Sequence, residues 1–455
     1  MDMKDNNKKI SPASSRGFKW GPFTARLPWL HMRVEWPELL QGIVVAASTG
    51  LALTPLLVAA FGLTFEEAIT ISIFHTILIS SHVVLFGEPF APGWVTPALP
   101  LALAFVLGGY DTPVERFQMM TALSLNLAGL MFFLGITGLG KKLILHIPTA
   151  IKAGIILGAA LSAFKRVFVD DFKTIEAMPV SMTLALITCL IVSFSIPFRA
   201  LKLKYKSLAA IASLGLLPGF IIAGIVGTYL GEITFDIQWG LLVPPVGDLM
   251  SKVSPFYIGW PPLSFFIEAI PLAIITYTIV FGDLLTGIAI IREAEKFRPD
   301  DKLDIDTSRS HIVIAIRNAV MGIVAPFFPT QGCLWAGVHV VVVQRWAEGK
   351  DKMETLIGGI SAYYLYGVPF LLLFLPVVTF LKPFMPIALA LTLILTGFAC
   401  AYVALSMPKG KEEKSIMLLT AFFLVFFAPW VGLVVGTLAV LLLLGTAAFK
   451  LKTIK

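Results

Sequence analysis

The chain has 455 residues, of which 57% are hydrophobic and only 14% are charged, and its mean hydropathy is +0.87. This composition excludes water-soluble, disordered, collagen-like and disulfide-stapled proteins and indicates a membrane protein. The three cysteines, Cys189, Cys333 and Cys400, fall inside apolar segments, so we expect them to pack as small hydrophobic residues. The sequence therefore predicts no cofactor and no metal site.

The first 36 residues are polar and basic, and they contain no short apolar core followed by a small-residue cleavage site. We interpret residues 1–36 as a cytoplasmic segment rather than a signal peptide. Because about 20 apolar residues cross a bilayer core of ~30 Å, the rest of the sequence supplies fourteen candidate membrane segments. They lie at 37–62, 66–87, 92–109, 114–139, 147–164, 178–197, 207–230, 260–291, 309–327, 330–344, 355–380, 383–406, 415–430 and 432–449.

The formal charge of +7 is distributed along the chain in a way that favours membrane topology over nucleic-acid binding. Of the 35 lysines and arginines, 27 fall in segments on the side of the N-terminus. Six fall in loops on the other side, at Arg116, Lys165, Arg166, Lys173, Lys252 and Lys382. Since basic residues concentrate in cytoplasmic loops, we expect a multi-pass protein of the cell (inner or plasma) membrane with both termini cytoplasmic and no nucleic-acid partner.

Two of the segments are interrupted by proline and glycine. The third opens at 87–100 with four prolines and two glycines, and the tenth opens with Ala-Pro-Phe-Phe-Pro-Thr-Gln-Gly at 325–332. Such backbone cannot form a continuous helix, and at membrane depth it survives only where protein buries it or where it lines a polar cavity. Both interruptions fall at the third segment of a seven-segment half, so we expect segments 3 and 10 to break near the midplane.

The two halves are residues 37–230 and 258–450, joined by an extracytoplasmic linker at 231–257. Because seven is odd, the second half must cross the membrane in the opposite sense to the first. We therefore predict an all-α polytopic membrane protein with 14 transmembrane segments in 7+7 inverted repeats. A pair of interrupted helices in inverted repeats indicates the binding site of a secondary transporter.

Several short motifs resemble the nucleobase/ascorbate transporter family. They are Thr-Pro-Leu-Leu at 54–57 with Phe-Gly-Leu-Thr at 61–64, the proline-broken third segment, Ile-Pro-Thr-Ala-Ile at 147–151, and Phe-Gly-Asp-Leu at 281–284. That family is a branch of the superfamily that also contains sulfate and bicarbonate permeases. The resemblance implies a core domain of the first to fourth and eighth to eleventh segments, a gate domain made of the others, and a homodimer through the gate domain.

Polar side chains and interrupted backbone from four segments would converge in such a fold. We predict that the substrate site contains Ser48, Thr49, Gly93, Trp94, Val95, Thr96, Tyr277, Thr278, Ile279, Thr330, Gln331 and Gly332. Backbone N–H groups at two half-helix starts favour an anionic or hydrogen-bond-accepting solute, and Trp94 could stack on a flat one. The resemblance implies that Ile279 stands where the family has a substrate-binding glutamate.

Ionisable residues inside membrane segments are expensive and indicate function. Asp283 and Arg317 each lie about eight residues from the cytoplasmic end of consecutive segments, which places both ~12 Å deep. We expect them to meet, and two interpretations stay open. The pair neutralises itself for structure, or Asp283 exchanges H⁺ or Na⁺ while Arg317 stabilises the emptied carboxylate. His75, His82 and His339 are expected mainly to pack, with a proton relay as the alternative.

Three function classes follow from these patterns. A secondary active transporter that moves a small polar or anionic solute by alternating access, coupled to H⁺ or Na⁺, explains the broken segments and the few buried charges, and the resemblance makes it similar to xanthine/uracil permeases. An anion exchanger or channel-like anion permease of the sulfate/bicarbonate branch is the alternative. An enzyme is not expected, because no nucleophile–base or metal-ligand cluster is found in the sequence.

Overall fold

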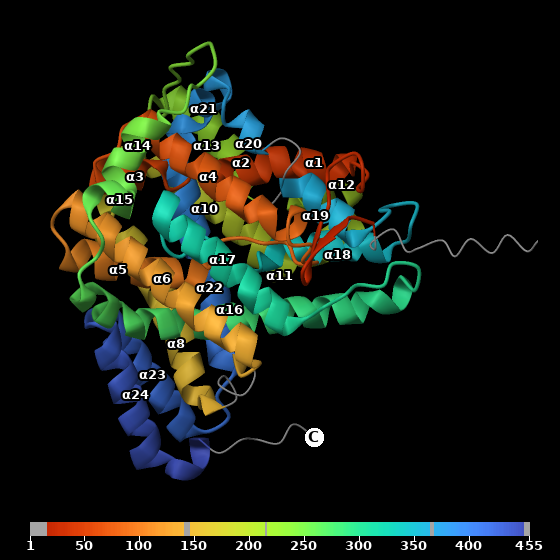
Figure 1. Ribbon diagram of the computed structural model, residues 1–455. Helices are drawn as coiled ribbons and strands as arrows, with labels where there is room; N and C mark the ends of the chain where they lie inside the picture. Colours follow the sequence, from red (N-terminus) through yellow and green to blue (C-terminus); the bar gives the residue numbers. More distant parts are fainter. Residues whose placement is uncertain (1–15, 141–145, 214–215, 365–367, 450–455) are drawn as a thin grey trace, which may run out of the picture.

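The computed structural model describes residues 16–140, 146–213, 216–364 and 368–449. These residues are mostly helical, and their only sheet is a two-stranded hairpin near the N-terminus (Figure 1). The prediction of a helical architecture is therefore confirmed.

The helices of the first half follow the predicted segments closely. They are α1 (Trp36–Gln41), η2 (Gly42–Ala46), α2 (Ala47–Gly50), α3 (Thr54–Phe61), α4 (Phe65–Val84), η3 (Thr96–Ala98), α5 (Leu99–Gly109), α6 (Pro113–Thr137), α8 (Thr149–Lys165), η4 (Arg166–Asp170), α9 (Phe172–Ala177), α10 (Pro179–Phe194), α11 (Ile196–Lys204), α12 (Lys206–Ser213) and α13 (Leu217–Leu230). The first predicted segment is thus a run of α1, η2, α2 and α3 rather than one regular helix.

The second half begins with two short helices in the predicted linker. Its elements are α14 (Val246–Val253), α15 (Pro255–Ile258), α16 (Leu263–Ala294), η5 (Glu295–Phe297), α17 (Thr307–Val324), α18 (Ala336–Ala347), α19 (Leu356–Tyr364), α20 (Val368–Leu371), α21 (Leu375–Leu381), η6 (Lys382–Phe384), α22 (Met385–Ser406), α23 (Lys411–Phe426), α24 (Pro429–Leu443) and η7 (Thr446–Phe449). The loop expected around Lys382 is instead a 3₁₀ turn between α21 and α22, because proline is tolerated at the start of a helix.

Within the described residues, four helical stretches are long and apolar enough to cross a membrane on their own. They are Phe65–Val84, Pro113–Thr137, Leu263–Phe297 and Leu375–Ser406. The pair α10 and α11, which is bent by 66°, makes a fifth. With the apolar composition, these stretches establish a multi-pass membrane protein, while the count of fourteen segments and their inverted repeats stay predictions.

Local sequence explains where the long helices begin. Thr64 caps α4, accepting a hydrogen bond from the N–H of Glu67, whose carboxylate accepts from the Thr64 N–H in return. Thr112 and Glu115 form the same reciprocal box at the start of α6. Each box satisfies two backbone donors that helix geometry leaves free, which stabilises a helix start by roughly 1 kcal/mol.

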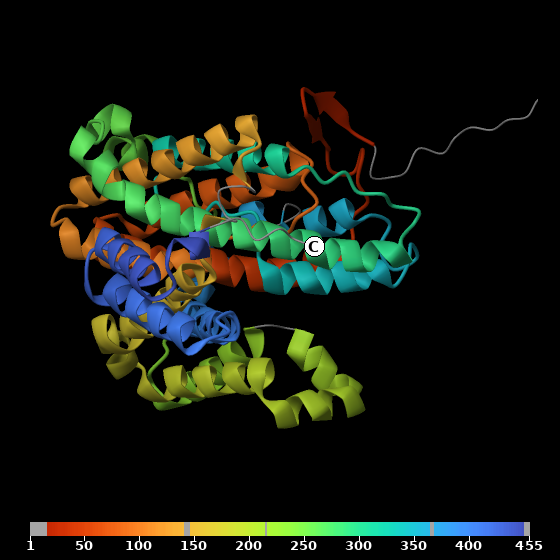
Figure 2. The same ribbon diagram turned by 90° about the horizontal axis from the view of Figure 1, so that it is seen from below.

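The helices form two packed groups. In one, α6 packs against α16 and α17; in the other, α8 packs against α22, α23 and α24, and α10 packs against α13 and α22. Figure 2 shows α10–α13 on one side of the molecule and α16 and α17 on the opposite side, with α8, α22, α23 and α24 between them. This grouping is compatible with the predicted core and gate domains, whose boundaries stay a prediction.

An N-terminal hairpin, β1 (Phe18–Trp20) and β2 (Phe23–Ala25), covers the end of α4. The indole of Trp20 donates to the carbonyl of Leu85 at 2.8 Å, and the N–H of Arg26 donates to the carbonyl of Val84 at 2.6 Å. These bonds satisfy carbonyls that the helix terminus leaves free. The polar composition of residues 1–36 does not predict this hairpin.

Candidate functional site

The chain becomes extended after α4 and again after α17, at residues 87–95 and 325–335, and the two stretches pair antiparallel. The pairing bonds are Val95 N–H to Pro329 O at 2.9 Å, Gly332 N–H to Gly93 O at 2.8 Å and Trp335 N–H to Ala91 O at 2.7 Å. Each stretch therefore satisfies the backbone of the other where helical bonds are missing. Both predicted interruptions are present, and together they form one crossing.

Glycine is required at the centre of this crossing. A Cβ on Gly93 would lie 2.8 Å from the Cβ of Trp335, and a Cβ on Gly332 would lie 2.9 Å from the carbonyl oxygen of Gly93. Real Cβ atoms do not approach other atoms this closely, so any larger residue would push the two stretches apart. Gly93 and Gly332 are thus in direct contact, and their place in a substrate site stays a prediction.

A half-helix starts immediately after each extended stretch. The first begins with η3 at Thr96 and continues into α5, and the second is α18, which begins at Ala336. In a helix the N–H groups of the first turn have no intrahelical acceptor and carry the positive end of the helix dipole. Ala336 and Gly337 are exposed, so the first turn of α18 is open to a ligand.

Arg317 of α17 lies behind the crossing and is fully buried, with 0% of its surface exposed. Its guanidinium donates to the carbonyls of Leu78 and Gly332 at 2.9 and 3.0 Å and to the side-chain oxygen of Gln331 at 2.8 Å. It also donates to Nδ1 of His82 at 3.2 Å. Arg317 therefore ties α4 to the second extended stretch through neutral acceptors.

No carboxylate lies within ion-pair distance of Arg317 among the described residues. Because an arginine has no acceptor, the bond to His82 requires the imidazole proton to be on Nε2, and this buried nitrogen has no partner in the described part of the chain. A charged His82 would face Arg317 directly, so the arrangement holds His82 neutral. The crossing thus retains one full positive charge.

The predicted pairing of Asp283 with Arg317 is wrong. Within the described residues, Asp283 makes no hydrogen bond or ion pair, and its side chain is half-buried on α16. α16 meets the crossing one turn earlier, where the carbonyl of Val280 accepts a hydrogen bond from the Cys333 thiol at 3.6 Å. The Arg317 guanidinium points toward α4 and the second extended stretch, and equal depth in the sequence does not specify how a helix is rotated about its axis.

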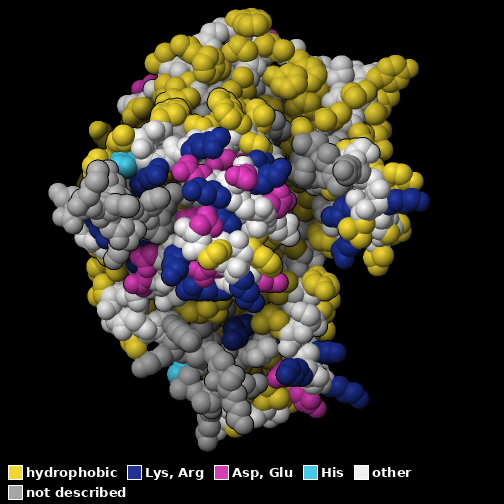
Figure 3. Space-filling model, turned by 90° about the vertical axis from the view of Figure 1, so that its right-hand side faces the viewer, with side chains coloured by type: hydrophobic (Ala, Val, Ile, Leu, Met, Phe, Trp, Pro, Cys, Tyr) yellow, Lys and Arg dark blue, Asp and Glu magenta, His cyan; other side chains and the backbone are white. Residues whose placement is uncertain are grey.

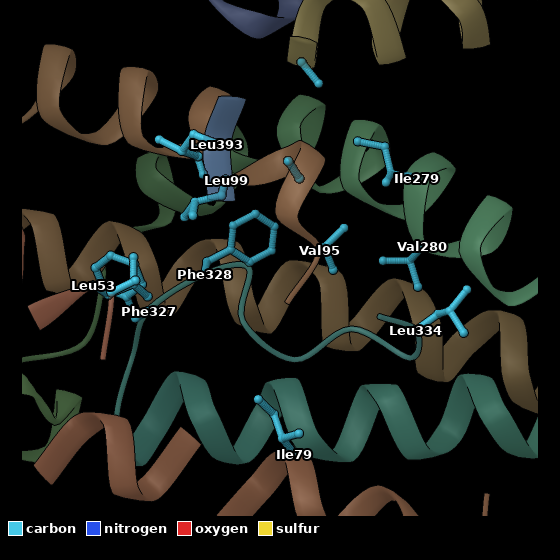
Figure 4. Close-up of a cluster of buried hydrophobic side chains, with 14 of the residues drawn as sticks. Leu53, Ile79, Val95, Leu99, Ile279, Val280, Phe327, Phe328, Leu334 and Leu393 are labelled. Atoms are coloured by element: carbon cyan, nitrogen blue, oxygen red, sulfur yellow. The ribbon is translucent and has the colours of Figure 1, made fainter. Parts of the chain in front are cut away.

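Apolar side chains surround the crossing (Figure 4). Val95 and Phe328 come from the two extended stretches, Ile279 from α16 and Leu393 from α22, and all four are buried. Figure 4 places Val95 between the crossing and the α16 residues, with Leu334 below Val280. The low-dielectric surroundings strengthen the field of the helix ends and of Arg317 at this point.

The other predicted site residues divide into two groups. Thr330 and Gln331 are fully buried in the crossing, and Trp94 and Thr96 are half-buried at its edge. Thr49 and Thr278 instead bond back to their own helices, at Val45 O (2.9 Å) and Ile274 O (3.0 Å). Tyr277 points away from the crossing and donates to Gly140 O at 3.1 Å. The side chain of Ser48 lies outside the described residues.

Sequence reasoning missed several neighbours of the crossing. His82 contacts Arg317, and His339 accepts a hydrogen bond from the N–H of Ala91 at 3.2 Å. His75 bonds the carbonyl of Ala325 at 2.8 Å. His75 therefore holds α4, and His339 holds α18, to the extended stretches, while His82 joins α4 to Arg317 of α17. The sequence indicated these three histidines only by their position in apolar segments next to or within an interrupted segment.

Comparison with known proteins gives matches by structure. No family model and no curated protein matches the chain by sequence. A structure of SLC26A9 matches with a TM-score of 0.54 at 17% identity, over 90% of this chain and 65% of that one. The murine Slc26a9 anion transporter in the inward-facing state matches with a TM-score of 0.50 at 15% identity, over 90% and 68%.

The transmembrane domain of BicA, a bicarbonate transporter of a cyanobacterium, matches at 15% identity with a TM-score of 0.49, over 91% of this chain and 99% of that one. The chain spans about two thirds of the length of the SLC26A9 structures. At such identities the likeness shows the fold, which is similar to that of SLC26 transporter membrane domains. The nucleobase/ascorbate branch is not specifically shown by these matches.

Proposed function

We propose that this chain is a secondary transporter that carries a small anion across the membrane by alternating access. The observation that carries the proposal is the crossing of residues 87–95 and 325–335, where two half-helix starts meet in front of Arg317. The likeness to the fold of an anion transporter, Slc26a9, supports the same class. Such a site offers positive potential and free N–H donors in an apolar setting, which suits an anion.

An anion is favoured over a nucleobase by the side chains that face the crossing. Ile279 and Leu334 are 6% and 3% exposed and carry no hydrogen-bonding group. A site that reads the edges of a ring needs matched donors and acceptors, because an unpaired polar group on the buried ligand is costly. An anion can be bound by helix N-termini and the charge of Arg317 without such a matched set of donors and acceptors.

Ion coupling is assigned to Asp283 within this proposal. Its carboxylate is half-buried in the middle of α16 without a partner among the described residues, one turn from Val280, whose carbonyl contacts the Cys333 thiol in the crossing at 3.6 Å. A carboxylate placed so can take up H⁺ or Na⁺, and either change alters the potential at the anion site. An anion and a cation bound together would neutralise each other while the site moves.

The proposal is tested by binding and uptake with the purified protein. Thermal unfolding in detergent is measured with sulfate, bicarbonate, chloride and dicarboxylates, and separately with uracil and xanthine, because a ligand of the folded state raises Tm by mass action. Proteoliposome uptake of the stabilising anion is then followed with imposed H⁺ or Na⁺ gradients. Stabilisation by uracil or xanthine alone would contradict the anion assignment, and uptake that no gradient drives uphill would favour a channel.

The same proposal includes the repeat structure, the orientation of the termini and the oligomeric state. We infer two inverted repeats, cytoplasmic termini and a homodimer through the group of α8, α10, α13, α22, α23 and α24. Cysteine accessibility from each side of the membrane tests the orientation, since Cys189, Cys333 and Cys400 are all buried and leave introduced cysteines as the reactive ones. Cross-linking within proteoliposomes tests the dimer.

A further inference from the structure

A short basic helix, α11, leaves the end of α10 at an angle of 66°. Ser195 caps it by accepting a hydrogen bond from the N–H of Phe198 at 3.3 Å, so the chain turns and starts a new helix instead of continuing the span. α11 contacts α10 and α12. It lies on the side of the protein that the distribution of basic residues predicts to be cytoplasmic.

The outer face of α11 is apolar and flanked by basic side chains. Ile196 and Leu203, seven residues apart and therefore on one face, are 77% and 85% exposed. Ala200 lies between them and is exposed, while Arg199 and Lys204 stand at the two edges of this face and are exposed as well. An exposed apolar strip with cations along its edges is the pattern of a helix lying in the headgroup layer of a bilayer.

The charge around this helix is of one sign. Residues 177–231 contain four basic residues and no aspartate or glutamate. Arg199 and Lys202 make no ion pair among the described residues, and Lys204 lies 5.5 Å from the ring centroid of Tyr205, over its face. Figure 3 shows this lobe at the right as Lys and Arg among hydrophobic side chains, whereas the centre of the same face mixes both signs.

We propose that α11 is a binding surface for anionic phospholipid headgroups of the adjacent leaflet. Its apolar strip enters the boundary of the acyl chains, and the three cations contact the phosphates. A second copy of the chain fits less well, because a symmetric contact through this face would bring the same unpaired cations together. The proposal does not depend on which solute the protein carries.

The first test measures phosphatidylglycerol bound to the full-length protein in detergent by native mass spectrometry, with phosphatidylcholine as reference. The variant R199Q/K202Q/K204Q should bind phosphatidylglycerol about 100-fold more weakly at low salt, since each basic residue near an anionic surface contributes about fivefold. The control K409Q/K411Q/K414Q alters the start of α23, whose first turn also holds Glu412 and Glu413, and it should change binding by less than about fivefold.

An equal loss in both variants, or no loss in the first, would overturn the proposal. Glycerol phosphate, the soluble headgroup, should leave Tm unchanged; stabilisation equal to that by the lipid would mean that the site binds free phosphate. A wild-type Tm of the first variant in phosphatidylcholine shows that it folds.

A second test does not depend on removing charge. Leu203→Cys and, as a control, Glu412→Cys are labelled with a fluorophore in lipid nanodiscs, which is selective because the native cysteines are buried. Lipids with a spin-labelled headgroup should quench the probe at position 203 several-fold more than the probe at 412. Equal quenching, or quenching at 203 that changes with the number of protein copies per disc, would overturn the lipid assignment.

Discussion

Arg309 and Arg317 stand on the same helix, α17, and both are buried, but their surroundings differ in kind. Arg309 is 9% exposed and pairs with Glu88 at 2.6 Å and with Asp304 at 2.5 Å. Arg317, two turns further on, is fully buried and meets only carbonyls, an amide oxygen and an imidazole nitrogen. One cation is neutralised by its neighbours, and the other keeps its charge.

This difference indicates a structural role for Arg309 and a functional role for Arg317 on the same helix. A buried ion pair adds little net stability relative to apolar packing, but removing one partner is strongly destabilising. A buried cation held by neutral dipoles is more expensive to keep and offers its charge to whatever binds nearby. We infer that Arg309 and Glu88 fix the end of the first extended stretch, and that Arg317 sets the potential of the crossing.

The largest effect is expected from Arg317→Gln. Removing the guanidinium takes the donors from Leu78 O, Gly332 O and Gln331, which costs about 3 kcal/mol of folding stability or more. It also removes a unit charge that contributes about 2 kcal/mol to anion binding, for an effective dielectric constant near 20 and a separation of ~7 Å. Anion uptake in proteoliposomes should fall about 30-fold after correction for folded protein.

Arg317→Lys is the matched control, because it keeps the charge but not the fork of donors. Its anion affinity should lie between those of the wild type and Arg317→Gln. A folded Arg317→Gln protein that binds the anion as tightly as the wild type would contradict the assignment of Arg317.

Breaking the neutralised pair should affect stability without affecting affinity. Glu88→Gln leaves Arg309 with only the exposed partner Asp304, and we expect a loss of about 3 kcal/mol. Thermal unfolding measures this loss, and anion affinity should change less than about threefold, because Arg309 stands about 12 Å along α17 from Arg317, beyond the Debye length of about 8 Å. The double variant with Arg309→Gln should lose less than the sum of the single variants. Additive losses would show that the two side chains do not interact.

Asp283→Asn tests whether an unpaired carboxylate, like the unpaired Arg317, affects transport more than stability. Because Asp283 has no partner among the described residues, stability should change by less than about 1 kcal/mol. Gradient-driven uptake should fall about tenfold, and its dependence on H⁺ or Na⁺ should disappear, while exchange of anion for anion continues. Uptake that keeps its wild-type ion dependence would place coupling elsewhere.

Glu232 is a half-buried, negative counterpart of Arg317, because its carboxylate is held by hydrogen bonds from neutral donors. Its carboxylate accepts from the N–H groups of Val180 and Ser181 at 3.0 and 2.8 Å and from the Ser181 hydroxyl at 2.6 Å, at the start of α10. Burial opposes the charged form, but these bonds outweigh it and lower the pKa of Glu232 below 4.5. Its contribution is therefore complete above about pH 5 and is lost as pH falls through the lowered pKa.

Glu232→Gln should cost about 0.5–1 kcal/mol at pH 7, the value of a charge and cap at a helix start. Thermal unfolding at pH 7 and pH 3.5 measures it, and the difference between wild type and variant should shrink at the lower pH. A difference that grows toward low pH would contradict the sign of the pKa shift.

Sequence patterns predicted the helices well because hydrophobic length and proline are local signals. Each of the fourteen predicted ranges contains a helix or a run of short helices, and both interruptions occur where Pro89 and Pro326 stand. The hairpin at 18–25 was missed because two three-residue strands give no periodicity. Its partner, the end of α4, lies more than sixty residues away.

The site was harder to predict than the fold. Gly93 and Gly332 were predicted because each lies in a proline-containing stretch that interrupts a membrane segment. Tyr277 was misplaced because periodicity identifies a helix face but not which neighbour that face meets. The partners of Arg317 are mostly backbone carbonyls, which every residue carries, so no residue type in the sequence could reveal them.

The crossing also sets an order of events during synthesis. Residues 87–95 leave the ribosome about 240 residues before their partners at 325–335, an interval on the order of tens of seconds at ~5–20 residues per second. Until then the first extended stretch has no strand to pair with, whereas the end of α4 just before it already has the hairpin at residues 18–25 as a partner. The crossing at the centre of the molecule is thus completed late. Until the second half is synthesised, the unpaired backbone groups of residues 87–95 in the nascent chain have to be kept out of contact with lipid.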